Sequence, residues 1–306
     1  MTDSIRDMVI IGGGPAGLTA GIYASRALMN VVLLEKSAYG GQMLTTAHLE
    51  NYPGFPDGIG GFELADLMHK QAETFELPIE YRSVDKIRKE GELFILDSGS
   101  EEIRTKSVVL ATGATPNKMG VPGEERLTGR GVSYCATCDG ALYRERTVAV
   151  IGGGDSAVEE ALFLTRFASR VHIVHRRDQL RAVPLTSKRA LENEKITMEW
   201  NTVLTEVLGE DEVKELLLKD VKTGETRSIE ADGVFIYVGI TPNTDFVSEL
   251  AQLDSNGYIV TDKNMQSSVP GLYAAGDVRS GSIRQVSSAV GDGATASFYA
   301  YKYLEE

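Results

Sequence analysis

Two stretches of the chain, 140 positions apart, share one succession of apolar, small and polar residues. Residues 8–11 and 148–151 are short apolar runs that each end at a row of glycines. Each is followed by helically spaced apolar residues and then by a second apolar run, at 31–35 and 171–175. Unbroken apolar runs that alternate with helices are typical of parallel strands buried on both faces. The pattern therefore predicts two strand–helix–strand units.

A second repeat marks where the chain would pass between domains. Gly-Ala-Thr-Pro-Asn at 113–117 follows the run 108–111, and Gly-Ile-Thr-Pro-Asn at 239–243 follows the run 234–238. A strand that ends in glycine and proline indicates an exit from a sheet. We expect an α/β fold with two Rossmann-like dinucleotide-binding domains, the second inserted into the first. The predicted bounds are residues 1–117 and 244–306 for the first domain and 118–243 for the second.

Each strand–helix junction carries a glycine-rich loop of the kind that binds a dinucleotide. Small residues at these positions allow a tight turn, let backbone N–H groups approach a pyrophosphate, and point the N-terminus of the helix at the anion. On its own, the motif occurs about as often in an incidental turn as in a nucleotide-binding loop. The preceding strand and the following helix favour nucleotide binding here. The residues expected to line the two loops are Gly12, Gly14, Pro15, Ala16 and Gly17, and Gly152, Gly154, Asp155, Ser156 and Ala157.

The residue that ends the second strand of each unit predicts which nucleotide binds. Glu35 ends it in the first unit, where a carboxylate accepts hydrogen bonds from ribose hydroxyls. His175 takes this place in the second unit and is followed by Arg176, Arg177 and Arg181, whose guanidinium groups match a 2′-phosphate. The alternative is a solvated basic helix start. The prediction for Arg181 also depends on Pro184, because proline lacks an N–H and would kink a helix.

One site of each kind predicts a resident FAD and an exchanging NADPH. The run 272–278 supplies a further strand and glycine turn, whose Asp277 carboxylate could reach the ribityl chain of a flavin.

The chain has two cysteines, Cys135 and Cys138, three positions apart. One such pair is a poor framework for a secreted fold of 306 residues, whereas a C-x-x-C pair suits thiol–disulfide exchange. Asp139 follows directly as a candidate proton donor and acceptor. The alternatives are two inert buried thiols or half of a zinc site. Because the remaining candidate ligands, His48, His69, His172 and His175, do not have zinc-site spacing, we expect no metal.

Composition and charge argue against several other classes of protein. With 42% hydrophobic and 25% charged residues the chain has the composition of an ordinary soluble protein, long enough for two domains. A formal net charge of −13 argues against nucleic acid as a partner. The apolar run near the N-terminus is too short for a signal peptide or a membrane span, so we expect a cytoplasmic protein.

Taken together, these motifs closely resemble those of the low-molecular-weight bacterial thioredoxin reductases, along the whole chain. The resemblance is carried by Gly12-Gly13-Gly14-Pro15-Ala16-Gly17, Gly40-Gly41-Gln42, Glu50-Asn51-Tyr52-Pro53-Gly54, Ala111-Thr112-Gly113, Cys135-Ala136-Thr137-Cys138-Asp139-Gly140, His175-Arg176-Arg177, Ala275-Gly276-Asp277 and Arg284-Gln285-Val286.

The resemblance implies a homodimer that reduces thioredoxin or a thioredoxin-like protein. It implies that Cys135 and Cys138 form a redox-active disulfide, with Asp139 as acid and base. It also implies further FAD contacts, although Asn51 could instead cap a turn and Gly40-Gly41 could be a simple bend. These contacts are Lys36, Gly41, Gln42, Asn51, Thr112, Gly113, Gly276, Asp277, Arg284, Gln285 and Val286.

The predicted route takes hydride from NADPH to FAD, electrons from FAD to the disulfide, and then dithiol exchange with the partner protein. Cys138 is expected to face the flavin. Because the cysteines and the NADPH loop lie in one domain, we expect that domain to swing about residues 115–117 and 241–243. Three rival functions are a ferredoxin-NADP reductase, a small-molecule dithiol oxidase and a non-catalytic flavin and thiol redox sensor. The first has no use for the cysteines, and the last has little need of a second dinucleotide.

Overall fold

The computed structural model of the chain describes residues 5–46, 49 and 51–305, and these fall into two compact units. The first unit comprises Met1–Leu44, Tyr52–Thr115 and Thr241–Glu306, and the second comprises Thr45–Asn51 and Pro116–Ile240. Glu50 and His48, named above in a motif and as a possible ligand, lie outside the described residues.

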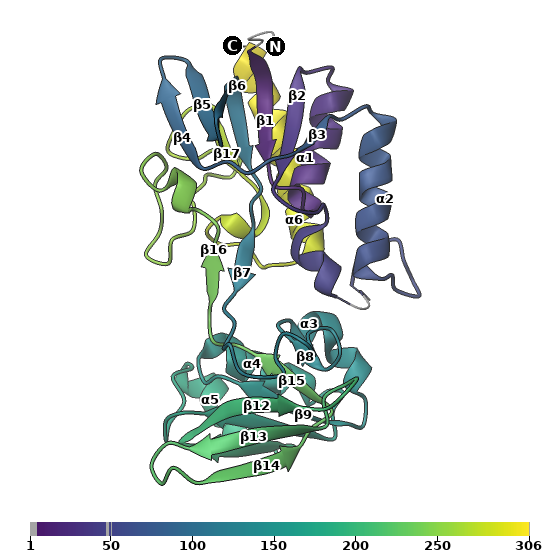
Figure 1. Cartoon of the computed structure of the whole chain (residues 1–306), viewed down its shortest axis with the longest axis vertical. Helices are drawn as coiled ribbons and strands as arrows, with labels where there is room; N and C mark the ends of the chain where they lie inside the picture. The colour runs from purple at the N-terminus through teal and green to yellow at the C-terminus, as the bar shows by residue number, and fades with distance from the viewer. Residues whose placement is uncertain (1–4, 47–48, 50, 306) are drawn as a thin grey trace. The chain divides into compact units, whose positions relative to one another are not determined.

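The first unit is built on a seven-stranded sheet with the order β3-β2-β1-β6-β5-β4 and with β17 paired to the end of β6 (Figure 1). Strands β1, β2, β3, β6 and β17 are parallel, whereas β4, β5 and the start of β6 form an antiparallel meander. The strands span Arg6–Ile11 (β1), Val31–Glu35 (β2), Ile79–Tyr81 (β3), Lys86–Glu90 (β4), Leu93–Ser98 (β5), Glu101–Leu110 (β6) and Leu272–Ala274 (β17).

Both faces of this sheet are covered, which explains the unbroken apolar runs. Val9, Ile11 and Leu34 belong to a buried cluster on one face, and the alternate residues Met8 and Ile10 are fully buried on the other. Helices α1 and α6 pack on each other and against the strands, and α2 packs on α1 (Figure 1). The helices span Pro15–Arg26 (α1), Gly61–Thr74 (α2) and Val286–Glu305 (α6), with short turns Gly41–Thr45 (η1), Asp245–Val247 (η3) and Gly276–Val278 (η4).

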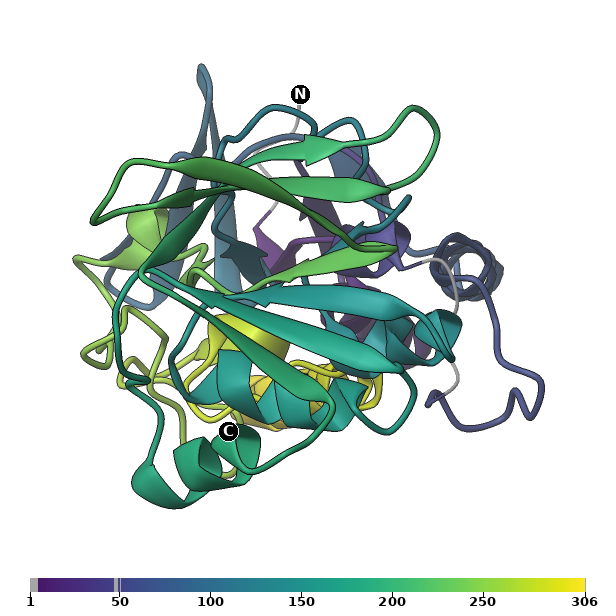
Figure 2. The ribbon, with the colours of Figure 1, turned by 90° about the horizontal axis from the view of Figure 1, so that it is seen from below.

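The second unit has three layers (Figure 2). A five-stranded parallel sheet, β11-β10-β9-β15-β8, carries α4 and α5 on one face and the antiparallel sheet β12-β13-β14 on the other. The strands span Val132–Ser133 (β8), Thr147–Ile151 (β9), Arg170–His175 (β10), Ile196–Trp200 (β11), Thr202–Leu208 (β12), Glu215–Asp220 (β13), Thr226–Glu230 (β14) and Gly233–Ile236 (β15). The helices span Ala136–Asp139 (α3), Asp155–Leu164 (α4) and Pro184–Leu191 (α5), with a short turn at Gly140–Tyr143 (η2).

The two predicted strand–helix–strand units are confirmed, and they share one register. Met8 lies opposite Val31 on β2, and Val148, which is 140 positions later than Met8, lies opposite Val171 on β10. The next strand repeats the match at an offset of 126, with Ser107 on β6 beside Met8 and Gly233 on β15 beside Val148. The sequence repeat is therefore a repeat of backbone pairing.

The segments predicted as chain crossings contain two short strands that pair with each other, β7 (Ala114–Pro116) and β16 (Ile240–Pro242). The Asn117 N–H donates to the Gly239 carbonyl over 2.9 Å, and the Asn243 N–H donates to the Gly113 carbonyl over 3.0 Å. Among the residues described, no helix combines the length and the apolar character that crossing a bilayer requires.

Candidate active site

The first glycine loop turns tightly between β1 and α1. Gly12 has a φ of +105°, and its N–H donates to the Leu34 carbonyl over 2.8 Å. A Cβ on Gly17 would lie 1.8 Å from the Gly12 carbonyl oxygen, so only glycine allows α1 to approach β1 so closely. A Cβ on Gly14, in contrast, would have no heavy atom within 4 Å. The loop therefore leaves open space at the N-terminus of α1, where an anion is stabilised.

Glu35 is turned toward this loop. It is buried, and its carboxylate accepts hydrogen bonds from the Gly13 N–H over 2.7 Å and the Ser37 N–H over 2.9 Å. Because each carboxylate oxygen has more than one lone pair, the group retains capacity to accept further hydrogen bonds from hydroxyl groups.

Three segments distant in sequence meet at this loop. The Gly40 N–H donates to the Gly13 carbonyl over 2.8 Å, and a Cβ on Gly41 would lie 3.4 Å from the Gly14 Cα. Ala111 and Thr112 lie against Gly12. Gly276 packs on Ala16: a Cβ on Gly276 would lie 3.1 Å from the Ala16 Cβ. The structure thus brings together the Gly40-Gly41, Ala111-Thr112 and Gly276-Asp277 motifs around an open, anion-accepting cradle, which fits the pyrophosphate and ribose of a dinucleotide.

Asp277 and Thr112 have side-chain partners on neighbouring segments. The Ser282 hydroxyl donates to Asp277 over 2.8 Å, and burial raises the pKa of this carboxyl while that hydrogen bond opposes the rise. The Thr112 hydroxyl donates to the Asn243 carbonyl over 2.8 Å, and the Asn243 side-chain amide donates back to the Thr112 carbonyl over 2.8 Å.

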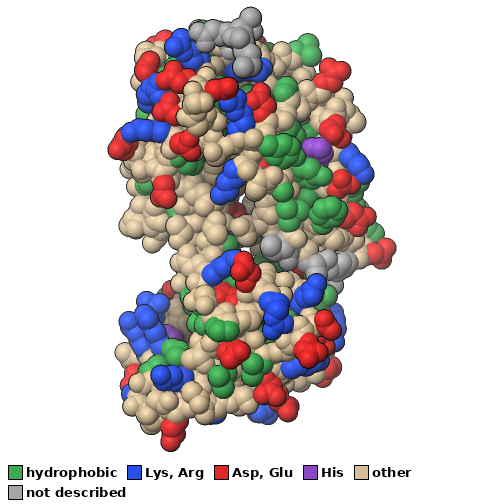
Figure 3. All heavy atoms as spheres, in the orientation of Figure 1, with side chains coloured by type: hydrophobic (Ala, Val, Ile, Leu, Met, Phe, Trp, Pro, Cys, Tyr) green, Lys and Arg blue, Asp and Glu red, His purple; other side chains and the backbone are tan. Residues whose placement is uncertain are grey.

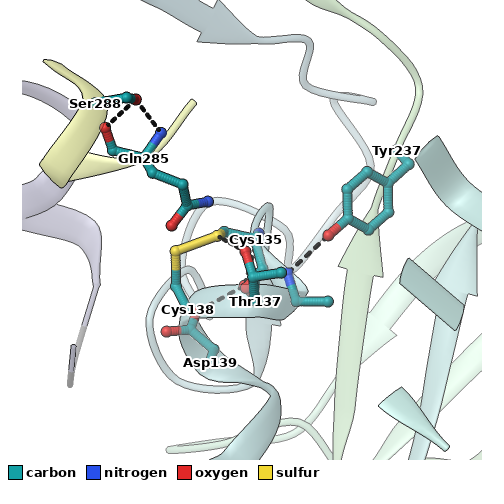
Figure 4. Close-up of a disulfide and its surroundings, with 9 residues drawn as sticks. Cys135, Thr137, Cys138, Asp139, Tyr237, Gln285 and Ser288 are labelled. Carbon is teal, nitrogen blue, oxygen red and sulfur yellow. Dashed lines mark hydrogen bonds between the residues drawn. A yellow bond between two sulfur atoms is a disulfide. The ribbon is translucent and has the colours of Figure 1, made fainter. Parts of the chain in front are cut away.

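For the other residues predicted to contact FAD, the structure gives their position and exposure. Lys36 is exposed directly after β2, Gln42 is exposed in η1, and Arg284 is exposed with a φ of +56°. Gln285 directly precedes α6, which begins at Val286, and the Ser288 hydroxyl donates to the Gln285 carbonyl over 2.8 Å (Figure 4). Asn51 belongs to the segment Thr45–Asn51, which groups with the second unit. Their roles stay predictions.

The second glycine loop repeats the geometry of the first but faces a different side chain. The Gly152 N–H donates to the Val174 carbonyl over 3.1 Å, as Gly12 does to Leu34. His175 replaces Glu35, and a Cβ on Gly153 would lie 2.4 Å from its Nδ1 atom. His175 is 5% exposed, and its Nε2 atom has no hydrogen-bond partner in the part of the chain that is described. Burial lowers the pKa of His175, and the nearby arginines lower it further.

Those arginines form a cluster beside the loop: Arg176, Arg177 and Arg181 are exposed, and all three act on the pKa of His175. The Arg181 N–H donates to the Gly153 carbonyl over 2.7 Å, and its guanidinium lies 3.9 Å from the position of a Cβ on Gly154. Two or three guanidinium groups at the N-terminus of α4 suit a phosphate that a carboxylate would repel.

Pro184 does not kink a helix, as the sequence had suggested it would. It is the first residue of α5, where its missing N–H costs nothing because the first turn of a helix leaves N–H groups unpaired. The preceding segment is instead fixed to α4, since the Asp155 carboxylate accepts a hydrogen bond from the Val183 N–H over 2.7 Å. Ser156 is exposed on the same turn of α4 and Ala157 is buried.

The two cysteines are joined by a disulfide at the start of α3, with their Cα atoms 5.3 Å apart (Figure 4). Both are half-buried. The Cys135 sulfur lies 3.4 Å from the Thr137 hydroxyl oxygen. No group of three or more side chains suited to holding a metal ion occurs among the described residues.

Two side chains that the sequence analysis missed hold the backbone of this segment. The Ser133 hydroxyl oxygen accepts a hydrogen bond from the Cys135 N–H over 3.1 Å, and the Tyr237 phenol accepts one from the Ala136 N–H over 2.7 Å (Figure 4). Burial raises the pKa of Tyr237 above its ordinary value, so the phenol stays protonated. No spacing in the sequence links Tyr237 to a segment about 100 residues away, although its position near the end of the predicted apolar run 234–238 was a weak signal.

Asp139 lies beneath the disulfide as a largely buried carboxyl. Its Oδ2 atom accepts a hydrogen bond from the Ser133 hydroxyl over 2.6 Å, and its Oδ1 atom is buried with no partner among the residues that can be described. Burial raises the pKa of Asp139, and the bond from Ser133 opposes that rise. A carboxyl so placed exchanges a proton closer to neutral pH than an exposed aspartate does, which is what acid–base work on a neighbouring thiol requires.

Comparison with known proteins gives a consistent result. Residues 6–293 match the family described as pyridine nucleotide-disulphide oxidoreductase. A thioredoxin reductase of Treponema pallidum is 49% identical over 98% of this chain and 97% of its own length. The thioredoxin reductase of Bacillus subtilis is 44% identical over 99% of this chain and 96% of its own length.

Two solved structures are similar to this one to different extents. The crystal structure of thioredoxin reductase from Streptococcus pyogenes is 47% identical, covers 99% of each chain and superposes with a TM-score of 0.95. That of the Lactococcus lactis enzyme, described as the FR conformation, is 46% identical over 98% of this chain and 99% of its own, with a TM-score of 0.69.

Proposed function

The chain belongs to the pyridine nucleotide-disulphide oxidoreductase family, and from that premise we propose that it is a flavoprotein that reduces the disulfide of thioredoxin with electrons from NADPH. The resemblance noted from its motifs is confirmed by identities of 44–49% over nearly the full length. One observation carries the proposal: Cys135 and Cys138 are paired as a disulfide above the buried Asp139 carboxyl, in the unit that also contains the second glycine loop.

The first unit would hold FAD. Gly14 leaves room for the pyrophosphate, Glu35 would accept hydrogen bonds from the ribose, and Asp277 would meet the ribityl chain. When bound, FAD passes on to the disulfide the electrons that arrive from NADPH as hydride. The residues of the chain bind and orient this cofactor.

The second unit would bind NADPH. Gly152, Gly154 and the N-terminus of α4 would take the pyrophosphate, and Arg176, Arg177 and Arg181 the 2′-phosphate. His175 is a buried neighbour of these arginines, and its lowered pKa keeps it neutral, so it packs beneath the loop without adding charge.

The cysteines and Asp139 would carry out the exchange. A thiolate of the reduced pair attacks one sulfur of the thioredoxin disulfide, forming a mixed disulfide and releasing the other sulfur as a thiolate. The second thiolate of the pair attacks the mixed disulfide, re-forming the Cys135–Cys138 bond and releasing reduced thioredoxin. Asp139 takes each proton from a thiol and returns it to a departing thiolate. The pair loses two electrons and two protons, and thioredoxin gains them.

We further propose that the domain with bounds 118–243 moves during turnover about β7 and β16. The cysteines and the NADPH loop lie in one unit, and each must reach a flavin bound by the other unit. The unequal superposition on relatives of nearly equal identity supports more than one arrangement in this family. Distances between labels on the two units, measured with and without NADPH, would test it: one unchanged distance distribution throughout would contradict the movement.

We propose that the protein is a cytoplasmic homodimer. Helices α1 and α2 pack side by side and carry the exposed side chains Tyr23, Phe62 and Leu67, and apolar side chains gather over these helices on the face that Figure 3 shows. An apolar face of this kind favours self-association. Sedimentation of the wild type and of Phe62→Glu tests the proposal, because a dimer through this face would dissociate in the variant.

The function is tested with the purified flavoprotein by following NADPH oxidation with and without oxidised thioredoxin. Cys135→Ser and Cys138→Ser should each abolish thioredoxin reduction but leave the reduction of the flavin by NADPH intact. Arg176→Ala with Arg177→Ala should raise the KM for NADPH far more than that for NADH. Turnover that needs oxygen instead of thioredoxin would favour a dithiol oxidase, and turnover that survives loss of the cysteines would favour a ferredoxin-NADP reductase.

A further inference from the structure

We propose that Ser133 is a positioning residue for the acid–base step: its hydroxyl ties the Asp139 carboxyl and the backbone of Cys135 into one hydrogen-bonded unit. The proposal rests on the function proposed above and adds a residue that neither the motifs nor the comparisons assign. Ser133 contacts neither cofactor nor partner in this scheme, and it acts through Asp139.

The geometry of the hydroxyl leaves it little choice of partners. Ser133 donates its single hydrogen to the Asp139 Oδ2 atom over 2.6 Å and accepts the Cys135 N–H over 3.1 Å. The Cys135 carbonyl, at 3.4 Å, is a far more distant acceptor than the carboxylate. Because the Cys135 N–H fixes the oxygen lone pairs, the hydroxyl hydrogen points at the carboxylate, and Oδ2 is held as an acceptor.

This arrangement assigns different roles to the two oxygens of Asp139. Oδ2 is occupied by Ser133, whereas Oδ1 is buried and has no partner among the residues described. A proton arriving from a thiol therefore finds Oδ1 as the free acceptor. The hydroxyl stabilises the charged carboxylate, and without it the burial of Asp139 would favour the neutral acid.

Ser133 is held in place by the sheet. It is 5% exposed and ends β8, where it pairs in parallel with Phe235 of β15. Tyr237, two positions later along the chain from Phe235, binds the Ala136 N–H. Residues at or just past the ends of two neighbouring strands of one sheet thus fix the N–H groups of Cys135 and Ala136, and Ser133 also binds the Asp139 carboxyl.

Among the described residues, few other groups act on the charge of Asp139. Those that face it are the two cysteines once reduced, the phenol of Tyr143 on η2 and that of Tyr237 after β15, while Glu160 on α4 faces Tyr237. Burial raises the pKa of Tyr143 to about 12 and raises that of Tyr237 as well, so both phenols are neutral at physiological pH. Burial also raises the pKa of Glu160, to about 7, so this carboxyl could add a second and separate titration.

The direct test is a titration of Asp139 in the oxidised holoenzyme by carboxyl ¹³C NMR with labelled aspartate, assigned by the loss of its signal in Asp139→Asn. Ser133→Ala should raise the pH at which Asp139 is half-protonated by roughly 1–2 units. This is the shift that corresponds to the free energy of one hydrogen bond to a charged group. Ser133→Thr retains the hydroxyl and should titrate within about 0.5 units of the wild type. Equal titration in Ser133→Ala and the wild type would overturn the proposal.

The second readout is the pH profile of thioredoxin reduction. Ser133→Ala should move its acid limb upward by the same amount as the NMR titration and lower kcat about tenfold below that limb, with the KM for NADPH unchanged. Thr202→Val is the matched control: its buried hydroxyl donates to the Trp200 carbonyl over 2.7 Å in the same unit, so its removal should leave the limb in place. A fall in kcat with an unmoved limb would contradict positioning of the base.

The two experiments distinguish a failure of this proposal from a failure of the proposed function. The NMR titration uses the oxidised protein, so it tests the role of Ser133 even if the chain does not reduce thioredoxin. An absence of thioredoxin reduction would refute only the proposed function. If Ser133→Ala does not fold, Ser133→Cys replaces it, because a thiol is a weak donor and should raise the half-protonation pH of Asp139 by a smaller amount in the same direction. No shift in a folded Ser133→Cys would then overturn the proposal.

Discussion

Two glycines of the first loop, Gly14 and Gly17, should respond to alanine in opposite ways. A Cβ on Gly17 would lie 1.8 Å from the Gly12 carbonyl oxygen, about 1.6 Å short of the 3.4 Å at which ordinary contact begins. Both sides of this contact are backbone, so no side chain can rotate away and α1 must separate from β1. A Cβ on Gly14 meets nothing within 4 Å, and its φ of −73° suits any residue.

The magnitudes follow from these distances. Overpacking a buried contact costs about 1–3 kcal/mol, and a backbone clash belongs at the upper end, so Gly17→Ala should lower the free energy of unfolding of the apoprotein by about 3 kcal/mol. That corresponds to a fall in Tm of roughly 6–12 °C for a domain of 150 to 250 residues. Gly14→Ala should leave the apoprotein as stable or slightly more stable, because alanine restricts the unfolded chain. It should weaken FAD binding at least about tenfold, because the Cβ fills the space left for the pyrophosphate.

The assay is urea unfolding of the two apoproteins followed by FAD titration of each variant that folds. Wild-type unfolding of Gly17→Ala would show that the close approach of α1 to β1 does not depend on glycine. Wild-type FAD affinity of Gly14→Ala would show that the open space beside Gly14 does not receive the cofactor. The first result would refute the inference about Gly17, and the second would refute the inference about Gly14.

Three further predictions concern other parts of the two units. Gly293→Ala should destabilise the first unit as Gly17→Ala does, since its Cβ would lie 2.1 Å from a backbone oxygen of α1, and urea unfolding of the apoprotein measures this. The hydrogen bond from His172 lowers the pKa of Glu199, so its stabilising effect is present at neutral pH and is lost as the pH falls through that lowered pKa. Glu199→Gln should therefore cost about 1–3 kcal/mol near pH 7 and progressively less below pH 4 in urea unfolding. Asp155→Ala should release the segment that carries Arg181 and raise the KM for NADPH several-fold, whereas Asp155→Asn, which retains an acceptor, should not; equal KM values in the two variants would contradict this anchoring role.

Much of the candidate site was accessible from the sequence because its signals are local. The glycine loops, the acid at Glu35 and its replacement by His175 all lie within about 25 residues of a predicted strand, and the repeat at 140 positions fixed their equivalence. Pro184 shows where local reasoning failed. Its effect depends on whether a helix precedes it or begins at it, and the hydrogen bonds of the preceding segment to Gly153 and Asp155 decide that.

Other parts of the site required the tertiary structure. The Arg279 guanidinium and the Gly276 N–H both bind the buried Asp292 carboxylate, which fixes the turn that carries Asp277. Arg279 and Asp292 are 13 positions apart and follow no recognisable motif, and Ser133 is equally inconspicuous in the sequence. Such partners meet only when helices and strands pack, so their spacing along the chain has no fixed period.

By itself the sequence determined the strand–helix–strand repeat, the two nucleotide loops, the cysteine pair and its adjacent carboxyl, because each depends on the spacing of neighbouring residues. Only the tertiary structure decided which distant groups complete them. Sheet order places Tyr237 against Ala136, and helix packing closes Gly276 onto α1. Burial, which no short segment specifies, raises the pKa of Asp139 and gives the hydroxyl of Ser133 its importance.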